Sequence, residues 1–348
     1  MRVKGLAVWV VLSAGMCGCS GVWGQAAAAA DHHAHVQSAT AAELLNRGAV
    51  GKGLAASGGE AEKPSTAAEL VAQLDAAGVG RAVALSDAYR LGSPYVRVAH
   101  EAAAVDAENA WTLAQVRPYA GRLVGFCSVN PVRWYAQASI ARCARIGLRG
   151  GLKLHLANAQ FEFEDEAQVR RLRAVFAEAN GLRMPILIHL RAGEVWDGAR
   201  EVKVFLEKVL PAAPDVVVQV AHAGGWGGYD RATDAGLAAF ADACAGDAAR
   251  CRNLYFDLAA VVLTEKDASA AEGSDARMLW EAQQGFAEGP ARLAEHLRRI
   301  GLGHVVFGTD WPVTTERESE AALRAGLRLT PAELDAVMGN VAPYFGKR

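Results

Sequence analysis

The sequence predicts a single-domain (β/α)8 TIM barrel, and three observations support this fold class. Eight short apolar runs rich in β-branched residues are separated by helical stretches such as "AQVRRLRAVFAEANG", an alternation that is typical of α/β folds. The 348 residues suit one such barrel without a second domain. A doubly wound sheet, the competing architecture, would be expected to carry a glycine-rich phosphate loop after its first strand, and the sequence has none.

The apolar runs are the expected strands, and threonines mark several helix starts between them. "TAAEL" occurs at Thr40 and Thr66, and "TPAEL" occurs at Thr330. In each motif the threonine can accept from a backbone N–H while the glutamate three residues later reaches back, which predicts a capping box. The strands are expected at 34–36, 81–86, 123–129, 151–156, 185–190, 216–222, 253–259 and 304–310.

The first residues have the features of an export signal. "MRVKG" is a positive n-region, the apolar run after it is short for a bilayer span, and "GQAAAAA" offers small residues for cleavage near Ala26 to Ala30. We therefore expect a signal peptide over 1–26, a catalytic barrel domain over 27–348 and a periplasmic or secreted protein. No transmembrane helix is expected in the mature chain. Gly18-Cys19 leaves a lipoprotein, lipidated at Cys19, as an open alternative.

Four cysteines remain after the expected cleavage, and export would permit disulfides between them. In "CAGDAARC", Cys244 and Cys251 are close enough to staple a surface loop. The alternative is that all four cysteines are reduced and that Cys127 is simply a core residue, with Cys143 also unpaired. No CxxC pair occurs, which argues against a structural zinc site built from cysteines.

Composition limits the classes of partner. The chain is 52% hydrophobic, which allows a substantial core, and its formal net charge is -2. Without a basic excess we expect neither nucleic acid nor an anionic membrane surface as a partner. A small-molecule substrate is the expected partner, and a homo-oligomer is left open by the sequence.

Polar residues follow the apolar runs where a TIM barrel carries its active site. In this fold, functional side chains come from the carboxyl ends of the strands. Several separate strands of this chain end in residues of the same chemical kind, which chance explains poorly. These residues are His33 and His35 on the first strand, Lys153 and His155 on the fourth, His189 on the fifth, His222 on the sixth and Asp310 on the eighth.

"DHHAHV", at 31–36, is the densest of these clusters. Residues i and i+2 of a strand point to the same side, so His33 and His35 are expected to face inward together while His32 faces away. Imidazole and carboxylate ligands suit zinc and other divalent ions. With His189 and Asp310 from across the barrel, the pair predicts a metal site that keeps a place for water. A metal lowers the pKa of such a water towards neutrality.

The order of these motifs resembles that of a known family. "DHHAH", "GLKLHL", "PILIHL", "VAHAGG" and "FGTDWP" together are similar to the amidohydrolase superfamily, in particular to its amidohydrolase-2 branch. That branch contains metal-dependent TIM-barrel hydrolases and decarboxylases of the aminocarboxymuconate-semialdehyde type. The resemblance covers roughly residues 30 to 346 and is specific for fold and metal, but poorly specific for substrate.

The resemblance implies roles for the residues at the strand ends. His33, His35, His189 and Asp310 match the family's metal ligands, and His222 matches the histidine that polarises substrate or moves a proton. Asp310 would also act as the general base toward the attacking water.

The same comparison leaves the number of metals open. One divalent ion per chain, expected to be Zn2+, follows from the mononuclear members. In binuclear members a carboxylated lysine on the fourth strand bridges two ions, and Lys153 stands at that place. A plain lysine, in contrast, is a poor metal ligand.

The loops after the strands are expected to complete the pocket. An arginine fork suits a substrate carboxylate, and aromatic side chains suit a ring or an apolar body. Ordinary loop packing is the competing explanation for each such residue. The candidate substrate-binding residues are Arg191, Trp196, Trp226, Tyr89 and His155.

Three function classes follow, in order of preference. The first is a metal-dependent hydrolase that cleaves an amide, ester or lactone bond of a small molecule. The second is a metal-dependent nonoxidative decarboxylase of a small carboxylic acid, which an arginine clamp and a glutamate in place of one first-strand histidine would favour. Both histidines are present, so both classes stay open. The third is a secreted metal-binding protein without activity, which the complete set of ligand types disfavours.

Overall fold

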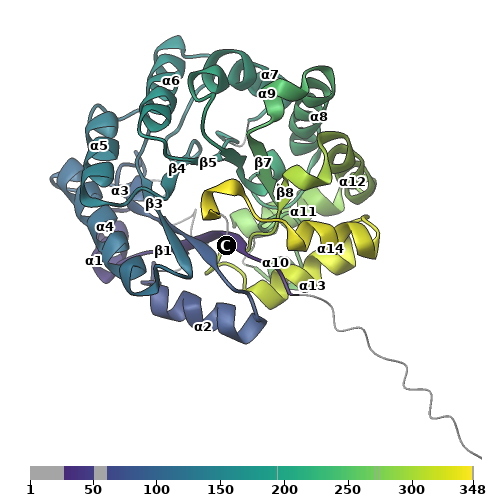
Figure 1. The fold of residues 1–348 in the computed structure, drawn as a ribbon, viewed down its shortest axis with the longest axis horizontal. Helices are drawn as coiled ribbons and strands as arrows, with labels where there is room; N and C mark the ends of the chain where they lie inside the picture. Colours follow the sequence, from purple (N-terminus) through teal and green to yellow (C-terminus); the bar gives the residue numbers. More distant parts are fainter. Residues whose placement is uncertain (1–26, 51–60, 194, 271, 273, 347–348) are drawn as a thin grey trace, which may run out of the picture.

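Eight parallel strands, each followed by helices, form the barrel in this computed structural model, so the predicted fold class is confirmed (Figure 1). The structure describes residues 27–50, 61–193, 195–270, 272 and 274–346. The expected signal peptide over 1–26 and the lipoprotein cysteine lie outside these residues. The strands are β1 (Asp31–Val36), β2 (Ala82–Ser86), β3 (Leu123–Ser128), β4 (Gly151–His155), β5 (Ile186–His189), β6 (Val218–Val220), β7 (Leu254–Asp257) and β8 (Val305–Val306).

The helices form the outer ring around this sheet (Figure 1). Within the described residues no helix is both long enough and apolar enough to cross a membrane. The helices are α1 (Ala39–Gly48), α2 (Ala67–Ala77), α3 (Ala88–Leu91), α4 (Glu101–Val116), α5 (Ala136–Ile146), α6 (Glu166–Gly181), α7 (Ala199–Val204), α8 (Arg231–Gly246), α9 (Ala248–Cys251), α10 (Glu265–Ala268), α11 (Asp275–Gln284), α12 (Gly289–Ile300), α13 (Glu316–Gly326) and α14 (Pro331–Gly339).

Two expected strands are shorter than predicted at their carboxyl ends. The runs 216–222 and 304–310 were expected to be extended throughout, but β6 ends at Val220 and β8 at Val306. The chain then turns through left-handed backbone, with φ of 53° at His222 and 65° at Asp310. Non-glycine residues adopt this conformation only when the surrounding structure holds them there. The shortening therefore occurs where two candidate functional side chains turn into the barrel.

The expected capping boxes are present at two of three positions. Thr66 and Thr330 each accept from the backbone N–H of the glutamate three residues on, and each glutamate bonds back to the threonine. The prediction at Thr40 is wrong, because α1 begins one residue before it. Ser38 caps α1, with its hydroxyl accepting from Ala41 N–H, so Thr40 lies inside the first turn.

The barrel closes where its first and last strands meet. Three backbone bonds make this seam: His32 N–H to Phe307 carbonyl, Asp310 N–H to His33 carbonyl, and His35 N–H to Trp311 carbonyl. They are 3.0, 2.7 and 2.7 Å long. The seam thus fixes the chain around the two first-strand histidines directly against the chain around Asp310.

The described residues contain two disulfides, one between two helices and one between a strand and a helix. Cys244–Cys251 links α8 to α9, as the sequence suggested. Cys127–Cys143 links β3 to α5 and was not predicted, so the alternative of four reduced cysteines is wrong. The second bridge depends on the packing of α5 against β3, which spacing alone does not reveal.

Replacing Cys127 and Cys143 together by alanine is expected to lower the free energy of unfolding by about 3 kcal/mol, since their bridge spans a separation of 16 residues. Urea unfolding followed by circular dichroism measures this change. The variant without Cys244 and Cys251 is the matched comparison, and its separation of 7 residues predicts a smaller loss. A Cys127/Cys143 variant as stable as the unmodified protein would contradict the expectation.

Candidate metal centre

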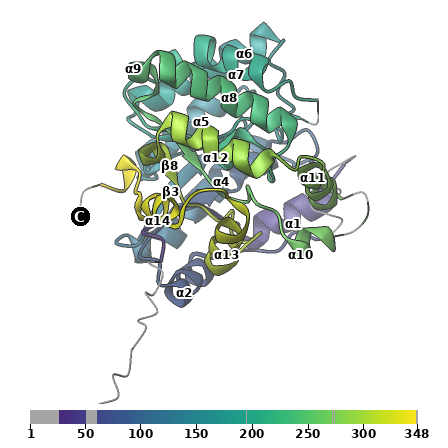
Figure 2. The same cartoon turned by 90° about the vertical axis from the view of Figure 1, so that its right-hand side faces the viewer.

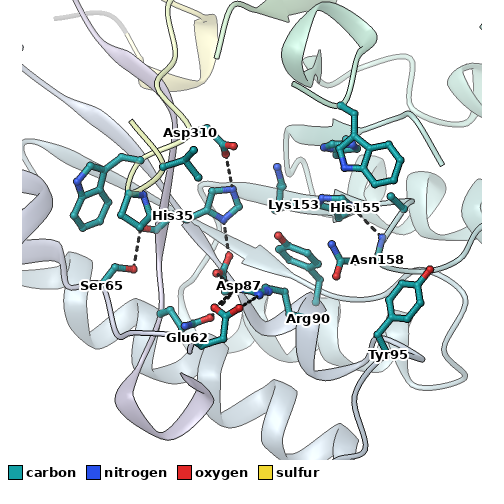
Figure 3. Close-up of a pocket in the computed structure, with 18 of the residues that line it drawn as sticks. His35, Glu62, Ser65, Asp87, Arg90, Tyr95, Lys153, His155, Asn158 and Asp310 are labelled. Atoms are coloured by element: carbon teal, nitrogen blue, oxygen red, sulfur yellow. Dashed lines mark hydrogen bonds and ion pairs between the residues drawn. The ribbon is translucent and has the colours of Figure 1, made fainter. Parts of the chain in front are cut away.

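Most of the predicted residues meet in one cavity at the carboxyl ends of the strands. The cavity has a volume of about 910 Å3, and Figure 3 shows 18 of the residues that line it. Eight candidate residues of the sequence lie on its wall. They are His35, Tyr89, Lys153, His155, His189, His222, Trp226 and Asp310.

The first-strand histidines point their Nε2 atoms at one another and at Asp310. His33 Nε2 lies 3.2 Å from His35 Nε2 and 3.2 Å from Asp310 Oδ1. His35 Nε2 lies 3.3 Å from the same oxygen. His32 points the other way, as predicted, and bonds through Nδ1 to the Phe307 carbonyl at 2.8 Å.

Fixed acceptors decide which ring nitrogen carries the proton. His33 Nδ1 lies 3.1 Å from Asp257 Oδ2, and His35 Nδ1 lies 2.5 Å from Asp87 Oδ1. The third ring, His222, places Nδ1 2.7 Å from the Ala259 carbonyl. A carbonyl or an ionised carboxylate only accepts, so each neutral ring donates through Nδ1–H and keeps a lone pair on Nε2.

Several lone pairs therefore converge on one small volume, and a cation is what such a volume suits. One ligand atom each from His33, His222 and Asp310 lies within 4.8 Å of the others. Nε2 of His189 is buried and has no hydrogen-bond partner in the described structure. Two imidazole lone pairs facing each other beside a carboxylate are unfavourable unless a cation or proton lies between them. The donor set thus fits a divalent metal.

Lys153 is part of this cluster. Its Nζ lies 2.9 Å from His33 Nε2, and the side chain is fully buried. Burial lowers the pKa of Lys153 to about 8, against the opposing pull of the Asp310 carboxylate. A lysine reacts with carbon dioxide only as the neutral amine, so this environment suits the carboxylated form that the sequence left open.

Asp310 is ionised in this setting. Burial alone would raise the pKa of its carboxyl, but the neighbouring His33, a hydrogen bond with His35 and the neighbouring His222 hold it well below the usual range. Burial acts in the same way on Asp257, where His33 lowers the pKa below its ordinary value. Both carboxylates are therefore available as acceptors at neutral pH.

His155 has the opposite tautomer from the three other rings. Its Nδ1 accepts from the backbone N–H of Asn158 at 3.2 Å, so its proton resides on Nε2. The ring is stacked between His189, at 3.9 Å between centroids, and Tyr89, at 5.2 Å. His155 is thus a fixed hydrogen-bond donor on the cavity wall.

Arg191 and Trp196, both expected to contact substrate, do not line this cavity. Arg191 is buried and donates to Asp230 at 2.8 Å and to Thr233 at 3.2 Å, because Asp230 caps α8 directly beneath the loop. Its guanidinium also lies over the Trp226 ring at 5.8 Å. Trp196 lines a separate hollow with Phe163 behind the same loop. Of the three aromatic residues that the sequence proposed for substrate binding, Tyr89 and Trp226 lie on the cavity wall.

One arginine that was not singled out in the sequence does line the cavity. Arg90 forms a bidentate pair with Glu62, at 2.5 and 2.7 Å, and lies 3.5 Å from Asp87 (Figure 3). Asp87 in turn bonds to His35. This chain of charges joins the segment before α2 to the first-strand histidines.

Asp257 is a buried carboxylate in contact with this cluster that the sequence reasoning missed. It is the last residue of β7 and is completely buried, and it bonds to both His33 Nδ1 and the His222 backbone N–H. The signal was present, since a polar residue at the carboxyl end of the run 253–259 obeys the same rule as the other strand ends.

Changing Asp257 to asparagine is expected to weaken metal binding about 10- to 100-fold, because a neutral amide accepts the His33 Nδ1–H bond more weakly than a carboxylate and fixes the ring less firmly. Competition with a coloured chelator measures the dissociation constant. Asp242, an exposed carboxylate on α8, gives the matched control as Asp242→Asn. Equal affinities for the two variants would show that Asp257 does not support a metal ligand.

Comparison with known proteins gives a family and a set of structural neighbours. A family model described as Amidohydrolase matches residues 30–342. No curated protein sequence matches the chain.

Three solved structures show the same fold at low sequence identity. The 5-carboxyvanillate decarboxylase of Novosphingobium aromaticivorans, complexed with manganese, has a TM-score of 0.59 and 14% identity, covering 92% of this chain and 97% of its own. An amidohydrolase of Burkholderia multivorans with bound zinc has a TM-score of 0.55 and 17% identity, and the match covers 90% of this chain and 96% of that one. A probable 2-pyrone-4,6-dicarboxylic acid hydrolase of Acinetobacter baumannii has a TM-score of 0.51 and 13% identity, and the match covers 89% of this chain and 95% of that one.

Proposed function

The chain belongs to the amidohydrolase family, and from that membership we propose that it is a metal-dependent hydrolase of a small amide, ester or lactone. The observation that carries the proposal is the convergence of His33 Nε2, His35 Nε2 and Asp310 Oδ1 within 3.3 Å of one another, with His35 and Asp310 on the cavity wall. We propose His33, His35, His189 and Asp310 as the metal ligands. When bound, a divalent ion supplies Lewis acidity and lowers the pKa of water.

Asp310 and His222 would share the proton transfers of hydrolysis. Asp310, ionised in this setting, accepts a proton from the water whose oxygen attacks the substrate carbonyl. His222 keeps a lone pair on Nε2, so it can take this proton from Asp310 and donate it to the leaving group. The carbonyl carbon gains the water oxygen, its bond to the leaving group breaks, and the leaving group departs with the proton.

His155 is better placed than His222 to donate a hydrogen bond to the developing oxyanion. The sequence suggested His222 for that role, but neutral His222 has no proton on the nitrogen that faces the cluster. His155 keeps its proton on Nε2 and lines the same cavity. We therefore propose His155 as a donor to a substrate oxygen, an arrangement that lowers the barrier when the oxygen gains charge.

Decarboxylation is the second candidate, on the same scaffold. The decarboxylase among the structural neighbours and the guanidinium of Arg90 on the cavity wall favour it. Two observations favour hydrolysis instead. Arg191, the arginine expected to clamp a carboxylate, is bound to Asp230 outside the cavity, and Arg90 is already paired with Glu62.

One screen separates the two reactions. The purified protein is loaded with zinc or manganese and offered small esters, lactones, amides and aromatic carboxylic acids, with a chelator-treated sample alongside. Acid release that the chelator abolishes is the expected result. If a carboxylic acid releases carbon dioxide and no ester, lactone or amide releases acid, decarboxylation would replace hydrolysis as the proposed reaction. Metal binding without turnover of any compound would overturn the assignment as an enzyme of either class.

We further propose that the protein is exported. The positive and apolar residues at the start of the sequence support this, and so do the two disulfides, because such bridges persist in oxidising compartments. Fractionation of cells that express the full-length chain, with mass measurement of its amino terminus, tests both the location and the cleavage near Ala26 to Ala30.

A further inference from the structure

The segment after α14 closes the end of the barrel opposite to the cavity. Figure 2 shows this C-terminal segment on one side of the molecule and α1, α10 and α11 on the other. Tyr344 and Phe345 pack against an inward-facing apolar cluster that includes Phe126 and Leu187. The backbone N–H of Ala342 also donates to His32 Nε2 at 3.1 Å.

A line of hydrogen bonds runs through the barrel from this segment to the metal cluster. The Tyr344 hydroxyl donates to Gln219 Oε1 at 2.5 Å. Gln219 Nε2 donates to Asp257 Oδ2 at 2.7 Å, and His33 Nδ1 lies 3.1 Å from that same oxygen. Gln219, Asp257 and His33 are completely buried, so water does not replace any of these partners.

Two acceptors fix which way the Gln219 amide faces. Its NH2 donates to Asp257 Oδ2 and, at 3.1 Å, to the His32 carbonyl, and neither atom can donate. The amide oxygen is therefore left for Tyr344, whose hydroxyl donates to it and holds the amide in this orientation. A reversed amide would press its oxygen against two acceptors, an arrangement that is costly at a buried site.

Four donors therefore hold the Asp257 carboxylate. Gln219 Nε2 and His33 Nδ1 bond to Oδ2. The backbone N–H groups of His222 and Ala259 bond to Oδ1, at 2.8 and 3.2 Å. Each anchor restricts the position of the carboxylate, and the carboxylate restricts the ring that carries a proposed metal ligand atom.

We propose that Tyr344 and Gln219 are positioning residues for the metal centre, acting on His33 through Asp257. The proposal rests on the proposed function, because it takes His33 as a metal ligand. It assigns to the C-terminal segment a role in setting metal affinity, although that segment lies at the far end of the barrel from the cavity.

Zinc affinity of four variants tests this proposal. Tyr344→Phe removes only the hydroxyl and is expected to bind zinc about fivefold more weakly, the effect of one neutral hydrogen bond. Gln219→Met keeps the side-chain length without its amide and is expected to weaken binding about tenfold or more. In the double variant the tyrosine change is expected to add nothing further, since its partner has gone. Tyr255→Phe, on β7 but outside the line of bonds, is the control and should match the unmodified protein.

A second readout makes the result independent of metal and of turnover. The His33 Nδ1–H proton, bonded to Asp257, gives a downfield NMR resonance in the metal-free protein, and its shift is expected to change in Tyr344→Phe but not in Tyr255→Phe. Variants that keep both the zinc affinity and this resonance would overturn the proposal. A simple additive loss of affinity in the double variant would also overturn it, because the two residues would then act separately.

If the unmodified protein binds no zinc, the metal-based function fails, and the resonance alone then decides whether the line of bonds orients His33. A loss of thermal stability shared by Tyr344→Phe and Tyr255→Phe, with unchanged affinity in both, would likewise count against positioning.

Discussion

Replacing His33 and His35 together by alanine is expected to take the metal content from about one ion per chain to nearly none. The two Nε2 atoms are 3.2 Å apart and each lies close to Asp310 Oδ1, so the double change removes two of the proposed ligands and leaves one face of the site without donors. Plasma mass spectrometry of the purified protein measures the ion count. Activity, where the screen has found a substrate, is expected to fall with it.

His100 gives the control for this experiment. It is exposed ahead of α4, so a His100→Ala protein should keep its metal. About two ions per chain in the unmodified protein would indicate a second site and make carboxylated Lys153 the bridge. No ion after reconstitution of the unmodified protein would remove the central claim, and "DHHAHV" would need another explanation.

Changing Asp310 to asparagine is expected to lower turnover about 10²- to 10⁴-fold. The carboxylate is held ionised by the histidines around it, whereas an amide takes no proton at neutral pH. Measurement of kcat and metal content on the same sample separates the two roles assigned to this residue. If turnover is lost while the metal is retained, the result supports Asp310 as the general base.

Loss of the metal with Asp310→Asn would show that ligation is the dominant role. Full activity with full metal content would contradict both roles. Asp242→Asn, which changes an exposed carboxylate on α8, is the matched control and is expected to leave both quantities unchanged.

Much of the fold and the centre of the site could be predicted from sequence because they obey short-range rules. The period of two along a strand places His33 and His35 on one side, and His32 is indeed on the other. The rule that strand ends carry the site brought Lys153, His155 and His222 into the cavity. These features depend on local geometry that the sequence pattern carries directly.

The features that were not predicted depend on partners far away in the sequence. Arg191 is turned out of the cavity by Asp230, 39 residues later. The protons on His33, His35 and His222 are placed by acceptors far along the chain, such as Asp257 for His33, 224 residues away. The same holds for Cys127 and Cys143, whose pairing follows from how α5 packs on β3. Thr40 was displaced as a cap by Ser38, a nearby competitor of similar propensity.

The seam between the first and last strands has a consequence for how the molecule acquires its metal. The proposed ligands His33 and His35 lie on β1, and the backbone bonds that place them opposite Asp310 join residues about 275 positions apart. Contacts between such distant parts of a chain form late in folding, since the loop between them has to be closed first. The ribosome completes the aspartate long after the histidines, so a growing chain has no complete site to load. An ion held by His33, His35 and Asp310 would therefore bind only once the first and last strands have met, and it would link the two ends of the sheet.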